Sequence, residues 1–178
     1  LKGYLDAYRV FGEDEFLNIA TKNAHFIKKK QLRSDGGLNH NYKNGKSNIN
    51  GYLEDYAAVI DAYIILYECT MDNEWLQTSK DLIDYCFAHF FDKTTNMFFF
   101  TSDLDESLIA RKTEIHDNVI PASNSIMARN LFKLGHYFHN TSYSETAQNM
   151  LNNVKQQLQE YPAGYSNWMQ LYADISSP

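Results

Sequence analysis

Cysteine is scarce in this sequence, and the two that occur resemble neither a redox motif nor a metal site. Cys69 and Cys86 form no CxxC pair and lack the spacing of zinc ligands. We therefore expect no metal and no other cofactor. Each cysteine lies in an apolar helical pattern, which is typical of a buried free thiol in a reducing compartment such as the cytoplasm.

Basic residues are outnumbered, with 16 Lys and Arg against 22 Asp and Glu and a net charge of −6. The lone basic run, 28–30, lies near the end of a predicted helix, where cations suit the helix dipole. We therefore expect no nucleic-acid partner. No apolar run approaches the roughly 20 residues of a membrane span, so no membrane association is expected. A glycine-rich phosphate loop and a GxSxG elbow are also missing.

An initiator methionine is absent as well. The chain begins with Leu1 inside a predicted helix, so we expect residues 1–178 to be a segment of a longer protein. Aromatic residues, in contrast, are abundant, with 13 Tyr and 11 Phe. A disordered segment would lack them, and the length suits one ordinary domain with a substantial core.

The apolar pattern predicts six helices in three pairs. The pairs are 1–11 with 14–32, 52–70 with 73–91, and 122–139 with 143–159. A fragment of a seventh helix is expected over about 165–174. The short turns within the pairs resemble one another, which indicates an internal repeat of about 60 to 70 residues.

The two helices of a pair differ in character. Helix 52–70 is apolar almost all round and is expected to be buried on all sides, whereas 73–91 has one apolar stripe. Inner helices alternating with outer ones describe an all-α fold, a partial (α/α) toroid of about three helical hairpins. We predict short strands over 38–42 and 97–101 in the long connections. A tetratricopeptide array, the alternative, has a shorter period, near 34 residues, and lacks such loops.

Polar residues stand at the start of the predicted helix 52–70. Glu54 and Asp55 lie in its first turn, with Asn50 as the expected N-cap. Acidic residues favour the positive end of a helix dipole, and that alone could explain one carboxylate. A carboxylate between the rings of Tyr52 and Tyr56 can instead have a raised pKa and act as an acid or base. Both interpretations stay open.

A second polar cluster precedes the predicted helix 122–139. Pro121 presets a helix start, which Ser123 or Asn124 can cap. His116 beside Asp117 suggests a base and the residue that orients it. The alternative is a capped helix with a solvated, charged approach.

Several sequence blocks resemble a known family. The blocks 51–57, 73–76, 98–101 and 121–125 follow one another as in the spermatogenesis-associated thioredoxin-domain family, which the chain resembles over nearly its whole length. That family usually has Pro-Ser-Gly-Asn-Ser where this chain has Pro-Ala-Ser-Asn-Ser at 121–125.

The resemblance implies a helical domain similar to six-hairpin glycosidases and N-acylglucosamine 2-epimerases. It also implies an upstream thioredoxin-like domain of the same protein, which this chain does not contain. Two hypotheses follow. The toroid binds or processes a carbohydrate at the inner-helix N-termini, as a glycosidase-like or epimerase-like protein, or it is a non-catalytic scaffold for the thioredoxin-like domain and its clients.

The first hypothesis assigns roles to named residues. The candidate acid/base residues are Glu54, Asp55 and Asp117. The candidate substrate-binding residues are Tyr42, Tyr52, Tyr56, Arg111, His116, Asn124 and Ser125. About three hairpins cannot close a six-hairpin ring, so we also expect an exposed apolar edge and self-association of this segment.

Overall fold

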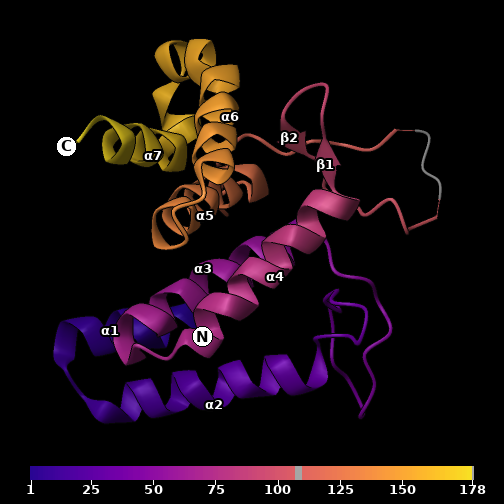
Figure 1. Ribbon diagram of the computed structural model, residues 1–178, viewed down its shortest axis with the longest axis vertical. Helices are drawn as coiled ribbons and strands as arrows, with labels where there is room; N and C mark the ends of the chain where they lie inside the picture. Colours follow the sequence, from indigo (N-terminus) through magenta and orange to yellow (C-terminus); the bar gives the residue numbers. More distant parts are fainter. Residues whose placement is uncertain (107–109, 178) are drawn as a thin grey trace. The chain divides into compact units, whose positions relative to one another are not determined.

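The computed structural model describes residues 1–106 and 110–177. The chain divides into two compact units, Leu1–Tyr85 and Cys86–Pro178, and each unit is described by itself. The first unit holds α1 (Lys2–Phe11), α2 (Asp14–Lys30), α3 (Leu53–Thr70) and most of α4 (Asn73–His89) (Figure 1). The second holds the end of α4, then β1 (Phe91–Asp92), β2 (Met97–Phe98), α5 (Ser123–Tyr137), α6 (Thr141–Glu160), the 3-10 turn η1 (Pro162–Tyr165) and α7 (Ser166–Ser176).

The predicted all-α class is confirmed. Every helix of the structure begins and ends within two residues of a predicted one. Among the described residues, the only paired strands are β1 and β2, an antiparallel pair that joins Phe91 to Phe98 and Asp92 to Met97. Residues 107–109 of the long connection 92–120 lie outside the described residues.

The predicted strand over 38–42 is wrong, because this segment makes only isolated bridges. Leu38 pairs with Leu32, and Asn39 pairs with Asn50. The chain then reverses through Asn44 and Gly45, both in the left-handed region with φ of 52° and 79°, and Lys43 pairs with Lys46 across this turn. No pair between Asn39–Asn50 and Lys43–Lys46 joins these bridges into a ladder. The strand predicted over 97–101 is present for its first two residues.

Helix α3 forms the centre of the first unit. Ten of its residues are buried, as predicted for an inner helix, whereas α2 buries only Ala20 and Ala24. The core cluster joins residues of α1, α2, α3 and α4: Leu5, Ala20, Ala24, Tyr63, Ile65, Leu66 and Trp75. Trp75 packs its ring 5.1 Å from that of Tyr63, which ties α4 to α3. An ion pair of 2.6 Å between Lys2 and the buried Asp61 ties α1 to α3.

Helix α5 is the buried helix of the second unit, and α6 packs against it as the other half of a hairpin. At Gly135 of α5 an added Cβ would collide with the Ser144 hydroxyl, so a glycine permits the two helices to approach closely. Helix α6 is capped by Asn140, whose side-chain oxygen accepts a hydrogen bond of 3.1 Å from the amide of Ser142.

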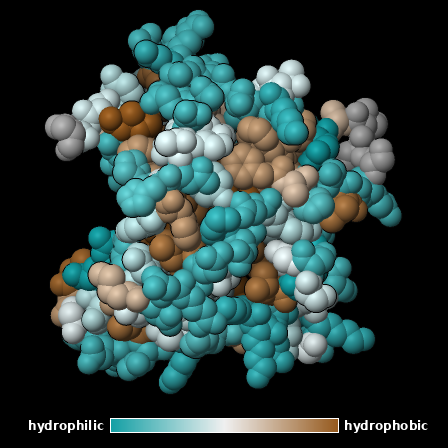
Figure 2. All heavy atoms as spheres, in the orientation of Figure 1, coloured by the Kyte–Doolittle hydropathy of each residue, from teal (hydrophilic) through white to brown (hydrophobic). Residues whose placement is uncertain are grey.

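Across the described residues, no helix has the length and apolar character to cross a membrane. On the face shown in Figure 2, hydrophilic side chains cover most of the surface and hydrophobic residues form separate patches.

Candidate functional site

The start of α3 is held by its own acidic residue. The Asp55 carboxylate accepts a hydrogen bond of 2.9 Å from the backbone amide of Tyr52, which is the N-cap residue. The prediction that Asn50 caps this helix is wrong, because the Asn50 side chain instead accepts a hydrogen bond from Arg33 at 2.5 Å. Asp55 thus satisfies an amide that would otherwise lack an intrahelical partner.

The same carboxylate also contacts a histidine. Nδ1 of His40 lies 2.9 Å and 3.1 Å from the two oxygens of Asp55. An ionised carboxylate can only accept, so Nδ1 is the donor in this contact, and in the neutral ring Nε2 then carries the lone pair. The ring of Tyr52 stands edge-on to the imidazole, 5.2 Å between centroids. His40 is 39% exposed and Asp55 is 23% exposed at the side chain, so Nε2 of an oriented base can meet a ligand.

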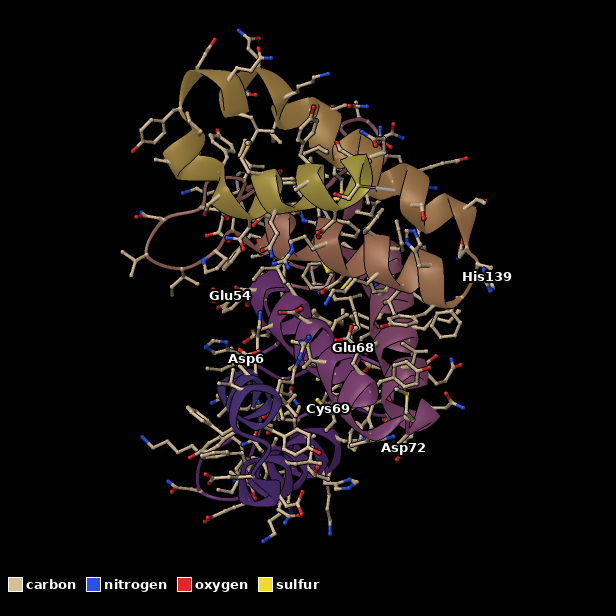
Figure 3. The ribbon with its side chains drawn as sticks, turned by 90° about the vertical axis from the view of Figure 1, so that its left-hand side faces the viewer. Asp6, Glu54, Glu68, Cys69, Asp72 and His139 are labelled. Carbon is tan, nitrogen blue, oxygen red and sulfur yellow. The ribbon has the colours of Figure 1, made fainter. Side chains whose placement is uncertain are left out.

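Glu54 precedes Asp55 at this helix start and is partly exposed. Figure 3 labels it at the beginning of α3, the helix that continues towards Glu68 and Cys69. The predicted acid/base pair therefore begins a buried helix, as expected. In the described part of the chain, no group of three or more His, Cys, Asp or Glu side chains could hold a metal ion.

The three tyrosines predicted to bind substrate differ in their exposure to solvent. Tyr42 is 36% exposed and packs edge-on against Phe26. Tyr52 is partly exposed beside His40. Tyr56 is fully buried, stacked on Tyr85, and its hydroxyl accepts a 2.8 Å hydrogen bond from the Leu38 amide. In this structure Tyr42 and Tyr52 present ring surface to solvent, and Tyr56 supports the loop that carries His40.

The start of α5 is built around Asp117, which is buried. One carboxylate oxygen accepts hydrogen bonds from the Ala122 amide at 2.9 Å and the Ser125 hydroxyl at 2.7 Å. The other oxygen accepts a 2.8 Å hydrogen bond from the amide of Asn167, in the first turn of α7. Asp117 therefore joins the beginnings of two helices. The N-cap residue is Ala122, so the prediction of a cap by Ser123 or Asn124 is wrong.

Asn124 and Arg111 bind backbone groups rather than facing a cavity. The fully buried Asn124 amide donates to the carbonyls of Phe98 and Glu114 and accepts from the amide of Phe98, each at 2.9 Å. Arg111 donates to the carbonyls of His89 and Thr101, and its guanidinium lies 4.3 Å from the ring centre of Phe99. Asn124 thus holds β2 and the loop at Glu114 to α5, and Arg111 holds the loop at Thr101 to the end of α4.

His116 and Asp117 do not form the predicted base–orienter pair. Nε2 of His116 lies 3.2 Å from the hydroxyl of Tyr165, and the two rings are 4.8 Å apart. Burial raises the pKa of Tyr165, and the negative charge of Asp117 acts in the same direction. In the structure His40 and Asp55 form a histidine–carboxylate pair, whereas His116 and Asp117 do not. His40 lies in the segment 38–42, and the alternating pattern of that segment is the signal in the sequence that could have found it.

Sequence comparison identifies relatives. The family model of the beta-L-arabinofuranosidase GH127 catalytic domain matches residues 1–172. Spermatogenesis-associated protein 20 of Homo sapiens is 28% identical over 144 residues, which are 75% of this chain and 18% of that protein. The resemblance inferred from the sequence blocks is therefore confirmed. The chain spans about a fifth of the length of the curated relatives it matches.

Solved structures share the fold. The GH76 α-mannanase of Bacteroides thetaiotaomicron superposes with a TM-score of 0.69 at 17% identity, over 87% of this chain and 42% of that one. Cellobiose 2-epimerase of Bacillus thermoamylovorans superposes with a TM-score of 0.64 at 16% identity, over 87% of this chain and 42% of that one. At this identity the likeness concerns the fold alone, and it confirms a partial α/α toroid.

Proposed function

The chain belongs to the family of the beta-L-arabinofuranosidase GH127 catalytic domain, and from this premise we propose that it binds and processes a carbohydrate at the start of α3. The single observation that carries the proposal is the His40–Asp55 pair beside Glu54. These groups stand at the beginning of a helix that is otherwise buried. The processing would take place in the longer protein of which this chain is a part.

Each residue of this site has a proposed part. Glu54 acts as an acid or base or binds a sugar hydroxyl, since glycoside chemistry needs a proton donor at the leaving group and a second carboxylate or base. Asp55 orients His40, whose Nε2 accepts a hydroxyl proton. The rings of Tyr42 and Tyr52 offer surface to the C–H face of a sugar.

The residues before and within the first turn of α5 have a different proposed part. Asp117, Ser125, Asn124 and Arg111 are engaged with the chain itself, so we assign them to positioning of α5 and its loop. His116 is exposed next to Tyr165 and stays a candidate for substrate binding.

A scaffold is the second candidate function, and the engagement of Asp117 favours it. This buried carboxylate takes three hydrogen bonds from its own chain, which suits a structural part better than a catalytic one. In this alternative the helical domain carries the thioredoxin-like domain and its clients in the cytoplasm and turns over no sugar.

Ligand titration of the full-length protein distinguishes the two. A panel of neutral glycosides, including methyl α-L-arabinofuranoside, is titrated by calorimetry against wild type, Asp55→Asn and His40→Gln. We expect both substitutions to weaken binding about tenfold or more, because each removes a charged or oriented partner. Asp14→Asn is the matched control, since it removes an acidic side chain from the first turn of the exposed helix α2. Equal affinities in all four proteins would overturn the site at α3, and no binding at all would favour the scaffold.

A further inference from the structure

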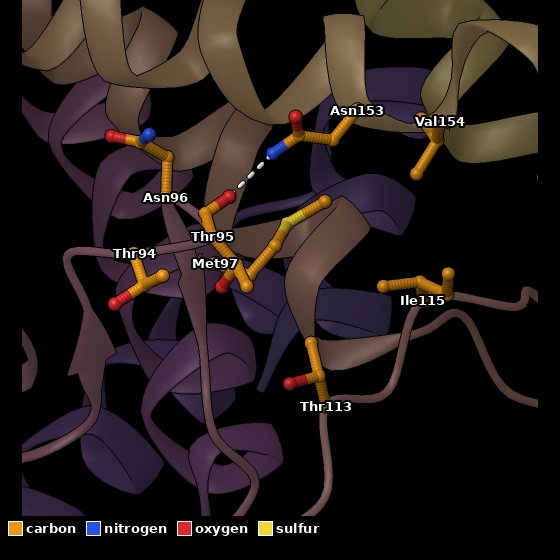
Figure 4. A pocket seen from close by; sticks show the side chains of 8 residues that line it. All are labelled: Thr94, Thr95, Asn96, Met97, Thr113, Ile115, Asn153 and Val154. Carbon is orange, nitrogen blue, oxygen red and sulfur yellow. Dashed lines mark hydrogen bonds between the residues drawn. The ribbon is translucent and has the colours of Figure 1, made fainter.

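A cavity of about 390 Å³ lies in the second unit, beside the turn that joins β1 to β2 (Figure 4). Its lining comes from three parts of the chain that are distant in the sequence: residues 94–97, Thr113 with Ile115, and residues 153–154. None of the lining side chains is ionisable. All of them belong to the second unit, whereas the site proposed at α3 belongs to the first.

The floor of the cavity is apolar. Met97 is 5% exposed and Val154 is fully buried, while Ile115 is partly exposed. Figure 4 shows the Met97 side chain in the middle of the set, with Ile115 and Val154 on one side of it. Such a floor excludes water from a ligand face that carries only C–H groups.

The rim of the cavity is polar but uncharged. The Asn153 amide nitrogen donates to the carbonyl of Thr95 at 2.5 Å, as drawn in Figure 4. Within the described residues, the side-chain oxygen of Asn153 and the hydroxyl of Thr113 have no hydrogen-bond partner. An amide oxygen accepts and a hydroxyl both donates and accepts, so together they match ligand hydroxyl groups.

The turn that borders the cavity is held in place from outside. The Asp92 carboxylate accepts hydrogen bonds from the Thr94 amide at 2.9 Å and the Thr95 hydroxyl at 2.8 Å. These bonds, with the Thr94 amide contributing most, hold the pKa of the Asp92 carboxyl below its usual value. A fixed negative charge next to an uncharged lining disfavours an anionic ligand.

We propose that this cavity binds an uncharged sugar ring, with the C–H face on Met97 and Ile115 and hydroxyl groups on Thr113 and Asn153. The choice of a sugar among uncharged hydroxylated ligands rests on the proposed function. The site itself rests on the cavity and its neutral lining, and it adds a carbohydrate contact in the second unit. A carboxylated sugar is rejected, because the lining offers no cation to replace the water lost by the carboxylate.

Binding to the full-length protein tests the site. The probes are methyl α-L-arabinofuranoside, methyl β-D-glucopyranoside and, as the charged counterpart, D-glucuronate. The variants are Thr113→Val and Asn153→Ala, and Asn152→Ala is the matched control. Asn152 is the neighbouring asparagine of α6, bonded to Gln148 and outside the cavity lining. We expect each of the two variants to bind a neutral probe on the order of two- to tenfold more weakly than wild type. The control should bind the probe with the affinity of wild type.

The location is read independently from the ¹³C-methyl methionine spectrum, with the Met97 signal assigned by Met97→Leu. A shift of the Met97 methyl on addition of a neutral probe, and none with D-glucuronate, supports the site. Binding that Asp55→Asn weakens and Asn153→Ala and Thr113→Val leave unchanged overturns this inference and leaves the proposed function standing. Equal binding of D-glucuronate overturns the neutral-sugar assignment, and no binding of any probe to wild type overturns both proposals.

Discussion

The buried tyrosine Tyr63 couples its ionisation to folding. It is 1% exposed, and its hydroxyl donates a 3.0 Å hydrogen bond to the carbonyl of Ala24. Burial raises the pKa of Tyr63 above the ordinary tyrosine value, and the negative charge of Glu74 adds to the effect. In the unfolded chain the same phenol loses its proton near pH 10, the ordinary value for tyrosine.

Folding stability should therefore fall at high pH through this residue. Below about pH 10 both states keep the proton, and above it the unfolded state binds fewer protons than the folded one, so the free energy of unfolding decreases as pH rises. We expect Tyr63→Phe to cost about 1 kcal/mol at pH 8, from the lost hydrogen bond, and to show a shallower decrease between pH 8 and pH 11. Urea unfolding at the two pH values measures both effects.

Tyr172→Phe is the control for this prediction, because Tyr172 is 50% exposed. Its unfolding free energy should follow wild type at both pH values. Identical slopes for wild type and Tyr63→Phe would contradict the assignment of a raised pKa to Tyr63.

Asp55 and His40 show how far the sequence predicts a site. The position of Asp55 in the first turn of a buried helix follows from local periodicity, and the structure confirms it. The contact with His40 could not be predicted in the same way, since the two residues are 15 apart and the path between them is irregular. That path depends on distant contacts, such as the hydrogen bond from the Leu38 amide to the Tyr56 hydroxyl.

At the scale of elements, the side chain of Asn124 makes the hydrogen bonds to β2 that a neighbouring strand would otherwise make. The amide and carbonyl of Phe98 would have no partner on their outer side, and Asn124 of α5 bonds both. Helix boundaries could be predicted because capping and amphipathic period are local. The strands could not be predicted at their true length, because β2 pairs with β1 over two residues only and its outer side is bonded by the Asn124 side chain of α5.

Replacement of this asparagine should loosen the turn. Asn124→Ala leaves the buried amide and carbonyl of Phe98 without a partner, so we expect a loss of about 2–5 kcal/mol in the free energy of unfolding. Hydrogen exchange measures the local effect. The Phe98 amide should exchange much faster, and the Phe99 amide, which donates to Phe90, should change less.

Asn149→Ala, on the exposed side of α6, serves as the control for this substitution. It should leave both the unfolding free energy and the exchange of Phe98 close to wild type. A protected Phe98 amide in Asn124→Ala would show that the asparagine does not hold the turn.

At the scale of the whole molecule, the segment exposes large apolar side chains at the end of α1. Val10 is 75% exposed and Phe11 is 67% exposed. We expect the isolated segment 1–178 to self-associate, because exposed apolar area favours contacts between copies. Sedimentation equilibrium over a range of concentrations should show species above the monomer mass, and Val10→Ser with Phe11→Ser should reduce them.

Asn18→Ser, on the exposed face of α2, is the matched surface control and should associate as wild type does. A wild-type segment that stays strictly monomeric at high concentration would contradict the prediction. Both outcomes concern the segment alone, since the relatives are about five times longer.

The Asp117 bridge also bears on the order in which a growing chain can fold. The Asn167 amide that completes this carboxylate follows it by 50 residues. Once α6 is complete and has left the ribosome, the hairpin α5–α6 can form, but the Asp117 carboxylate lacks its third donor until Asn167 is also available. The emergence of α7 supplies that donor. A chain that ends before Asn167 would thus hold a helical hairpin whose first turn lacks one hydrogen-bond donor, and this turn would be open to proteases and chaperones.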